Sequence, residues 1–392
     1  MNLAKLGGDI IFFGEDAVGA LSTELASTKK RAFIVMTGNI LDELGLLKPV
    51  TDALEKGGFT WEKFTDIEED ATFTSIKKGI EAMKKFEPDW IIGFGGGSAM
   101  DAAKTMWIFY ENPEVSELAE VAAPKTFAKL REKAKLCCIP TSAGTGSEVT
   151  RLAVVKDVDK LQKFVIVCRK GRMIPDVAIL DPQFSLTMPK GLTSSTGIDA
   201  ITHAIESYTS TTTNPYSEGP AMAGLKLAFE YLPTAYENGK DPVAREKMLI
   251  AANLAGMAFA NSLLGIVHSI AHSFGGEFGV PHGLANAITL PYIIEFHKSD
   301  EKVSERYRQL ANLLGSNSLL ESVKTLNDKV DIPKGMKDFI RKRLKADNDE
   351  AFEKHCGTIV EKAKKDIATL GAPVKPTDEQ WEELVKLAYY GK

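Results

Sequence analysis

The hydrophobic pattern of this chain of 392 residues changes near residue 190. Before that point short apolar runs alternate with helical patterns, and beyond it the apolar residues repeat with the period of a helix. Strand–helix alternation predicts a mainly parallel sheet covered on both faces. Because a chain of this length exceeds one ordinary core, we expect an α/β domain over residues 1–190 and an all-α domain over residues 191–392.

The expected elements follow from the runs themselves. Strands are predicted at Ile10–Phe13, Ala32–Met36, Phe59–Phe64, Trp90–Gly93, Leu136–Ile139, Ala153–Val155, Phe164–Val167 and Val177–Leu180. Helices are predicted at Ala71–Phe86, Ala99–Tyr110, Ala200–Tyr208, Gly219–Tyr231, Arg245–Leu264, Val303–Leu314 and Gln380–Tyr389.

Histidines are concentrated in the helical half. Of the six in the chain, His203, His268, His272 and His282 lie within one stretch. Asp199 and His203 are four residues apart, which places a carboxylate and an imidazole on one helix face. That pair alone is more often a plain hydrogen-bonded pair, but the further imidazoles favour a site for Fe(II), Zn(II) or Mn(II). Spacing leaves open whether His268 acts with His272 or with His282.

A glycine-rich turn marks the α/β half. The segment Trp90–Lys104 reads as strand, glycine turn and helix, with Ser98 as the expected N-cap. Backbone amides at such a helix start favour an anion. The segment differs from the Rossmann fingerprint because Ser98 replaces its third glycine. A second loop, Thr141–Thr150, is rich in Ser and Thr. Such a loop alone is commonly just solvated, but the two together indicate a dinucleotide.

These motifs together carry a resemblance. Gly95-Gly96-Gly97-Ser98-x-x-Asp101-x-x-Lys104, Thr141-x-x-Gly144-Thr145-Gly146-Ser147-Glu148, Asp199-x-x-x-His203-x-x-Glu206 and His268-x-x-x-His272-x9-His282-Gly283 look like those of the iron-containing (group III) alcohol dehydrogenases. The chain resembles the butanol and 1,3-propanediol dehydrogenase branch, from about residue 5 to its end. The resemblance implies a dehydroquinate synthase-like superfold with a dinucleotide-binding α/β domain and a helical metal-binding domain.

The resemblance also implies the roles of the histidines. Asp199, His203, His268 and His282 would hold Fe2+, although Zn2+ would fit the same ligands. His272 would lie by the nicotinamide as a catalytic residue without binding the metal. Glu206 is interpreted as a structural or supporting residue rather than a ligand. The catalytic site is expected in a cleft between the two domains.

Cofactor and substrate contacts are implied in the same way. The cofactor would be lined by Gly38, Asn39, Gly96, Gly97, Ser98, Asp101, Thr141, Ser142, Thr145, Val154 and Lys163. Asp101 is expected on the nicotinamide side. Phe259 and Leu264 align with walls of the alcohol pocket, although both residue types are also ordinary helix core.

Two departures from the family pattern matter. NAD-preferring relatives place an acid after the second strand, to hold the ribose 2′-hydroxyl, and here that position is Gly38. The missing carboxylate removes repulsion against a 2′-phosphate, so NADP(H) is predicted over NAD(H). No Arg or Lys follows at once, so the attraction is weak. The usual Asn-Pro-Thr of the family reads Asp70-Ala71-Thr72.

Composition limits the partners. A net charge of −5 argues against nucleic acid or an anionic membrane, and no apolar stretch is long enough to span a bilayer. The N-terminus lacks a signal-peptide pattern. Cysteines 137, 138, 168 and 356 form no C-x-x-C pair, which indicates reduced thiols in a cytoplasmic protein. The resemblance implies a homodimer or higher homo-oligomer that acts on a small-molecule alcohol or aldehyde.

Other readings remain open at this stage. An NAD(H)-preferring enzyme of the same family is the nearest one. A dehydroquinate synthase-like lyase would need a basic cluster for an anionic substrate, and no such cluster flanks the predicted ligands. A non-catalytic metal-binding helical protein would leave the two loops without a purpose.

Overall fold

The chain divides into two compact units. The computed structural model describes residues 4–25, 27–123, 125, 127, 129–159, 162–168 and 172–392. One unit extends to Thr187 and the other begins at Met188. We describe each unit by itself.

The first unit contains a parallel sheet of six strands. Its order is β1 (Ile10–Phe13), β8 (Val177–Leu180), β5 (Lys135–Pro140), β4 (Trp90–Gly95), β2 (Arg31–Thr37) and β3 (Thr60–Ile67). Every pairing in it is parallel. Strands β6 (Leu152–Asp157) and β7 (Gln162–Val167) form a separate antiparallel pair. The predicted mainly parallel α/β fold is confirmed.

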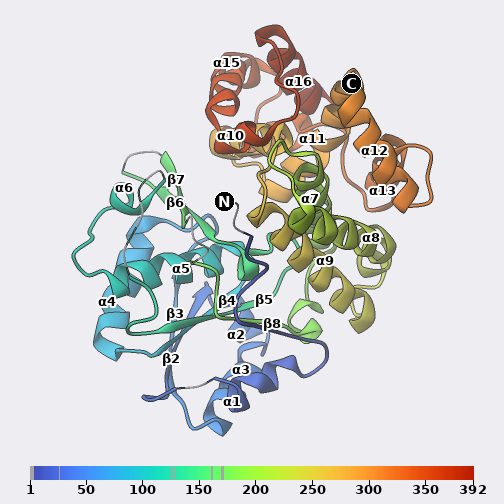
Figure 1. The fold of residues 1–392 in the computed structure, drawn as a ribbon. Helices are drawn as coiled ribbons and strands as arrows, with labels where there is room; N and C mark the ends of the chain where they lie inside the picture. Colours follow the sequence, from blue (N-terminus) through green and yellow to red (C-terminus); the bar gives the residue numbers. More distant parts are fainter. Residues whose placement is uncertain are drawn as a thin grey trace. The chain divides into compact units, whose positions relative to one another are not determined.

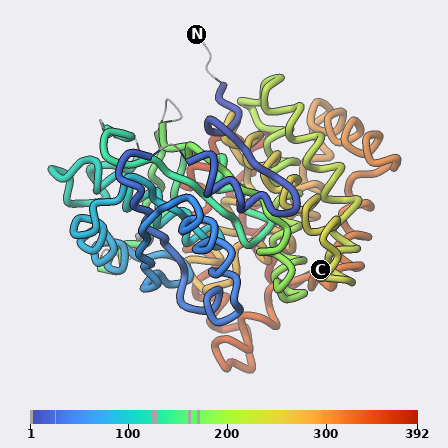
Figure 2. The backbone as a smooth tube through the Cα atoms, turned by 90° about the horizontal axis from the view of Figure 1, so that it is seen from below, coloured from blue at the N-terminus to red at the C-terminus, as the bar shows by residue number. Residues whose placement is uncertain are grey.

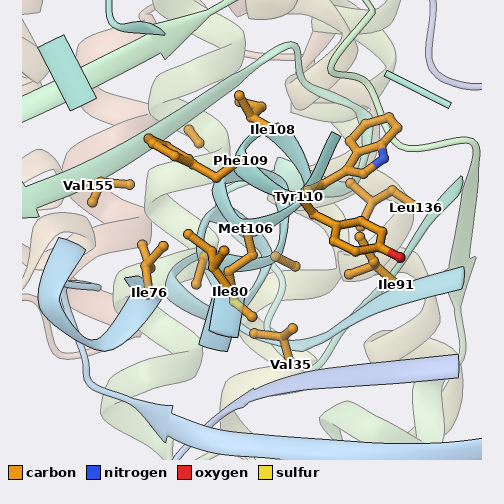
Figure 3. Close-up of a cluster of buried hydrophobic side chains, with 14 of the residues drawn as sticks. Val35, Ile76, Ile80, Ile91, Met106, Ile108, Phe109, Tyr110, Leu136 and Val155 are labelled. Atoms are coloured by element: carbon orange, nitrogen blue, oxygen red, sulfur yellow. The ribbon is translucent and has the colours of Figure 1, made fainter. Parts of the chain in front are cut away.

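Helices cover both faces of this sheet (Figure 1). Successive side chains of a strand point to opposite faces. Phe33 and Val35 of β2 join a buried cluster with α4 (Phe73–Phe86) and α5 (Gly97–Glu111), part of which is drawn in Figure 3. Ile34 and its alternating neighbours join a second cluster with α1 (Ala20–Thr23) and α3 (Leu47–Lys56). Burial on both faces explains why the central strands are continuously apolar.

The short elements of this unit lie in its connections. They are η1 (Ala17–Gly19), α2 (Ile40–Glu43), α6 (Leu118–Val121), η2 (Ser147–Val149) and η3 (Pro182–Ser185). Because all strands of the sheet run parallel, the loops after β2, β4 and β5 leave from the same edge. That edge carries the residues predicted to bind a dinucleotide.

The second unit is helical, and Figures 1 and 2 follow it from yellow-green to red. Residues 188–392 are all described and form no strand. Its elements are α7 (Lys190–Thr209), α8 (Pro215–Glu237), α9 (Pro242–Ala260), α10 (Ile266–Phe278), α11 (His282–His297), α12 (Glu301–Leu313), α13 (Leu319–Lys329), α14 (Lys337–Leu344), α15 (Glu350–Lys365), η4 (Ile367–Gly371) and α16 (Asp378–Tyr390). The predicted all-α second half is confirmed.

Helix α7 lies at the centre of this unit. It packs against α8, α9 and α11, and almost its whole length is buried. A Cβ atom at Gly197 would lie 2.4 Å from Leu232, so the glycine allows α8 to approach closely. The sequence predicted this helix only from Ala200, whereas it begins ten residues earlier, at Lys190. Within the described residues, no helix combines the length and the apolar character that crossing a membrane requires.

Candidate metal centre

Three helices bring the predicted metal ligands together. Asp199 and His203 lie on α7, His268 on α10, and His282 is the first residue of α11. One ligand atom from each lies within 4.8 Å of all the others. Asp199 Oδ1 is 3.9 Å from Nε2 of His203, 3.7 Å from Nε2 of His268 and 3.5 Å from Nε2 of His282. His272 is not in this group.

Two glycines allow the helices to approach so closely. A Cβ atom at Gly283 would lie 2.5 Å from the carbonyl oxygen of Ser195, so glycine there lets α11 begin against α7. A Cβ atom at Gly265 would lie 2.7 Å from Oε1 of Glu206. Any larger residue at either position would push His282 or His268 away from Asp199.

Glu206 sets the orientation of His268. It lies on α7, and its Oε2 is 2.5 Å from Nδ1 of His268, while its Oε1 accepts the backbone N–H of Val267 at 2.8 Å. A proton held on Nδ1 makes Nε2, the atom near Asp199, the nitrogen that a metal would bind. Glu206 thus contacts His268 on the side away from Asp199.

The carboxylate at the centre is deeply buried. The side chain of Asp199 is 2% exposed. Burial by itself favours the neutral acid, but the neighbouring imidazoles of His203 and His282 hold the pKa of Asp199 far below its usual range. His268 is also buried, yet the nearby carboxylates of Glu206 and Asp199 raise the pKa of His268 to about 9. This cluster therefore combines a stable anion with strongly basic nitrogen.

The donor set fits a divalent transition metal. One carboxylate oxygen and three imidazole nitrogens suit Fe(II) or Zn(II). Donors about 2.1 Å from a tetrahedral metal lie roughly 3.4 Å from one another. The observed separations from Asp199 of 3.5 to 3.9 Å are only slightly longer.

His272 has a different environment on the same helix. Its side chain is 34% exposed, and its Nδ1 is 2.9 Å from Oδ2 of Asp366. The ring stacks on that of His282 at a centroid distance of 5.1 Å. Asp366, which also accepts the backbone N–H of Ala368 at 2.8 Å, thus holds one ring nitrogen and leaves Nε2 for proton exchange.

One predicted pocket residue touches the cluster. The ring of Phe259, at the end of α9, stacks on His203 at a centroid distance of 4.5 Å. Leu264 lies in the connection to α10, directly before Gly265, and is partly exposed. Phe259 is therefore beside the proposed ligands, although it is also 7% exposed and part of the core.

The two dinucleotide loops lie side by side in the first unit. Gly95 of β4 pairs with Pro140 of β5, and the backbone N–H of Thr141 donates to the carbonyl of Gly95 at 3.0 Å. A Cβ atom at Gly97 would lie 2.9 Å from Thr145, and one at Gly96 would lie 3.4 Å from Ser142. The glycines thus let the second loop pack directly on the start of α5.

The predicted N-cap of α5 is wrong. Gly96 occupies the cap position and Ser98 lies in the first turn. The Ser98 hydroxyl instead accepts the backbone N–H of Asp70 at 3.1 Å. No side chain among the described residues caps this helix, so its first amides keep the arrangement that favours an anion.

Asp70 links two of the predicted cofactor residues. Its Oδ1 is 2.5 Å from Nζ of Lys163 on β7, while its backbone N–H binds Ser98. Its φ of 64° is the left-handed conformation, which Asp adopts more readily than most residues. The departure from the family's Asn-Pro-Thr at this point thus places a carboxylate between Lys163 and the glycine turn.

Asp101 acts within the protein in this structure. Its carboxylate accepts the hydroxyl of Ser147 at 2.7 Å and the backbone N–H of Val154 at 2.9 Å. Lys104, one turn further along α5, is completely buried and donates to Ser147 Oγ at 2.9 Å and to the Leu152 carbonyl at 2.9 Å. Both side chains therefore hold the second loop and strand β6 against α5.

Gly38 lies where β2 ends. Its φ is 60°, and a Cβ atom there would meet nothing within 4 Å. Its backbone N–H donates to the carbonyl of Thr65 at 3.0 Å. Asn39 follows as the N-cap residue of α2. The end of this strand is thus open around Gly38.

Sequence reasoning missed two residues that contact the predicted histidines. Asn286 lies one turn after His282, and its Nδ2 is 2.7 Å from Oδ1 of Asp199. Its spacing of four residues from His282 was a signal that could have found it. Asp366, the partner of His272, is 94 residues away in a charged stretch and gave no such signal.

Comparison with known proteins agrees with this geometry. Residues 9–182 match the family described as iron-containing alcohol dehydrogenase. Residues 193–389 match the C-terminal part of the Fe-containing alcohol dehydrogenase family. The two matches cover most of the chain.

Individual relatives are similar over almost the whole of this chain. The chain is 38% identical over 390 residues to an NADPH-dependent butanol dehydrogenase of Clostridium saccharobutylicum, covering 97% of this chain and 96% of that protein. It is 36% identical over 422 residues to the bifunctional aldehyde-alcohol dehydrogenase AdhE of Escherichia coli (strain K12). That match covers 99% of this chain but only 46% of the relative.

Solved structures share the fold. An alcohol dehydrogenase from Oenococcus oeni has a TM-score of 0.89 at 32% identity, and a 1,3-propanediol oxidoreductase 0.88 at 29%; each match covers 99% of this chain and 100% of the other. A sulfoacetaldehyde reductase from Bifidobacterium kashiwanohense in complex with NAD+ has a TM-score of 0.86 at 25% identity, with both chains fully covered.

The contact between Glu206 and His268 generates a first prediction. Replacing Glu206→Gln is expected to weaken Zn2+ binding by about 10–100-fold, because the orientation and basicity of His268 depend on the carboxylate. Affinity is measured by competition with a chromophoric chelator. Glu230→Gln, at an exposed position on α8, is the control and should leave the affinity unchanged. Equal affinities in the two variants would contradict the role assigned to Glu206.

Proposed function

This chain is an oxidoreductase of the iron-containing alcohol dehydrogenase family, and we propose that it transfers a hydride between NADP(H) and a small to medium primary alcohol or aldehyde. The observation that carries the proposal is the group formed by Asp199, His203, His268 and His282, whose ligand atoms lie within 4.8 Å of one another. These four residues would hold Fe2+, and Zn2+ would fit the same donors.

The proposed chemistry divides between the bound groups and the protein. A metal held by these residues supplies Lewis-acid polarisation of the substrate oxygen, and the dinucleotide carries the hydride. Glu206 would hold a proton on Nδ1 of His268, so that Nε2 is the nitrogen that binds the metal. The stacked ring of Phe259 shields His203 from water on one side.

His272 is the proposed proton-transfer residue. Its ring is partly exposed, stacks on His282 and is oriented by Asp366. A neutral imidazole held in this way can accept a proton at Nε2 and return it to solvent. Its lower burial compared with His268 supports exchange with water.

The cofactor is proposed to bind at the carboxyl edge of the parallel sheet. The amides of Gly97 and Ser98 at the uncapped start of α5 would bind the pyrophosphate. Lys163 adds a cation at the same place through its contact with Asp70. The remaining predicted contacts are Gly38, Asn39, Gly96, Asp101, Thr141, Ser142, Thr145 and Val154. Asp101 would act mainly by holding the backbone of Val154.

NADP(H) is favoured over NAD(H). The surroundings of Gly38 are open and would leave room for a 2′-phosphate, and an NADPH-dependent butanol dehydrogenase is 38% identical to this chain. An enzyme that prefers NAD(H) is the alternative, since the sulfoacetaldehyde reductase of the same fold was solved with NAD+. Phe259 and Leu264 would wall the substrate pocket with apolar surface, which suits uncharged alcohols and aldehydes. We also propose a cytoplasmic location, which is consistent with four buried free cysteines, and a homodimer or higher homo-oligomer.

Removing the metal tests the proposed function. Chelated protein, or the variant His268→Ala, is expected to lose most butanal reduction with NADPH, while NADPH binding stays largely intact. The reason is that the proposed ligands lie after residue 188 and the cofactor loops before it. Activity is measured anaerobically before and after adding Fe2+. Metal-free protein that reduces butanal at the full rate would refute the proposal.

Cofactor preference is tested at Gly38. The change Gly38→Asp is expected to shift the kcat/KM ratio from NADPH toward NADH, because a carboxylate repels the 2′-phosphate and accepts the 2′-hydroxyl. Gly45→Asp is a matched control, since Gly45 has a φ of 74° and equally open surroundings. It carries the same backbone strain without the change in cofactor preference. A wild-type protein with higher kcat/KM for NADH would show that the assignment is wrong.

The different roles of His272 and His282 are tested by the metal content of their variants. His272→Ala is expected to keep near-normal metal but to lower kcat by up to ~10²-fold and alter its pH profile, as for loss of a general acid or base. His282→Ala is expected to lose the metal. Bound metal is measured in both variants after dialysis. If His272→Ala loses its metal while His282→Ala retains it, the ligand assignment fails.

A further inference from the structure

Asn286 has an unusual position inside the cluster. It is completely buried on α11, one turn after His282. Its amide nitrogen Nδ2 lies 2.7 Å from Asp199 Oδ1, 3.1 Å from His282 Nε2 and 3.2 Å from His268 Nε2. A single nitrogen thus contacts three of the four proposed ligand atoms.

The chemistry of these atoms determines which end of the amide faces them. A carboxylate oxygen and an imidazole nitrogen with a free lone pair are acceptors, so a carbonyl oxygen at the same place would be repelled. The amide instead presents its N–H groups. Its own Oδ1 is buried and finds no hydrogen-bond partner in the part of the chain that the structure describes. An amide that leaves its carbonyl unsatisfied is held in that orientation by the acceptors that its nitrogen contacts.

The same lone pairs are the ones that a metal would use. The acceptor atoms Oδ1 of Asp199 and Nε2 of His282 lie 3.5 Å apart, and Nε2 of His268 lies 3.7 Å from the same Oδ1. Grouping buried acceptors in this way is unfavourable unless donors lie between them. Asn286 is the residue whose N–H groups are directed at this position from a helix that also carries a ligand.

We propose that Asn286 is a positioning residue that takes the place of the metal when none is bound: its two amide hydrogens are donated to Asp199 Oδ1 and His282 Nε2 until a cation displaces them. Asn286 thereby stabilises the metal-free protein with its ligands already assembled. It also competes with the metal, because the hydrogen bond to the lone pair of His282 ends when the metal binds. This inference rests on the metal site proposed above and concerns what holds its residues in place before the metal binds.

The proposal makes stability depend on both the amide and the metal. Asn286→Leu keeps the shape of the side chain and removes the donors. It is expected to lower the melting temperature of the metal-free protein by roughly 2–6 °C and to change that of the Zn2+-loaded protein much less. By linkage, Zn2+ should then bind on the order of 10-fold more tightly than to wild type. Asn286→Asp, which puts a carboxylate beside Asp199, should likewise lower the melting temperature of the metal-free protein and tighten the binding of Zn2+.

A second buried asparagine of the same unit is the matched control. Asn327 on α13 donates from Nδ2 to the carbonyl of Ala287 at 2.9 Å, and its Oδ1 likewise lacks a partner within the described residues. Asn327→Leu is therefore expected to lower both melting temperatures equally and to leave Zn2+ affinity unchanged. Full-length protein is used throughout, with melting followed by calorimetry and affinity by competition with a chelator.

The outcomes separate the inference from the proposed function. If wild-type protein binds no Zn2+ or Co2+, the metal site itself is wrong. If it binds them but Asn286→Leu is destabilised equally with and without Zn2+, as Asn327→Leu is, the inference is overturned and the metal site stands. A lower affinity in Asn286→Leu would also overturn it. A variant that folds only when Zn2+ is present would support the inference in its strongest form.

Discussion

The structure of the helical unit depends on one buried negative charge. Asp199 is 2% exposed, on a helix that is buried along most of its length. An ionised carboxylate in such surroundings is very costly unless charges or donors surround it. Those come from α7 itself through His203, from α10 through His268, and from α11 through His282 and Asn286. The contacts that hold these helices together are therefore the same contacts that assemble the proposed metal site.

In each histidine of α10, the nitrogen Nδ1 contacts a carboxylate. Glu206 holds Nδ1 of His268, and Asp366 holds Nδ1 of His272. The difference between the two lies in exposure, since the side chain of His268 is 1% exposed and that of His272 is 34% exposed. A deeply buried ring with a defined tautomer suits a ligand, and a partly exposed ring suits proton exchange. Two histidines of equal spacing thus acquire different properties from their partners.

The two histidines also show how much of the site could be predicted from the sequence. The period of the apolar residues predicted the change from α/β to helical structure, and the spacing of Asp199 and His203 predicted their shared helix face. Spacing could not separate His272 from His282, because both lie near His268. Contacts over 87 or 94 residues, as made by Asn286 and Asp366, leave no periodic trace in a single sequence. The N-cap of α5 was misassigned because Ser98 had a partner, Asp70, that local rules do not reveal.

In the α/β unit, too, buried charged side chains hold neighbouring elements together. Lys104 is completely buried, and its ammonium group donates to Ser147 and to the carbonyls of Thr150 and Leu152. Asp101 lies near that ammonium group, and its carboxylate accepts from the same serine. Burial alone would lower the pKa of Lys104, while the charge of Asp101 opposes that change. The second loop is therefore tied to the helix that starts at the glycine turn. A change in the shape of this loop would break these hydrogen bonds and leave a buried ammonium group without partners, which favours the observed conformation of the loop.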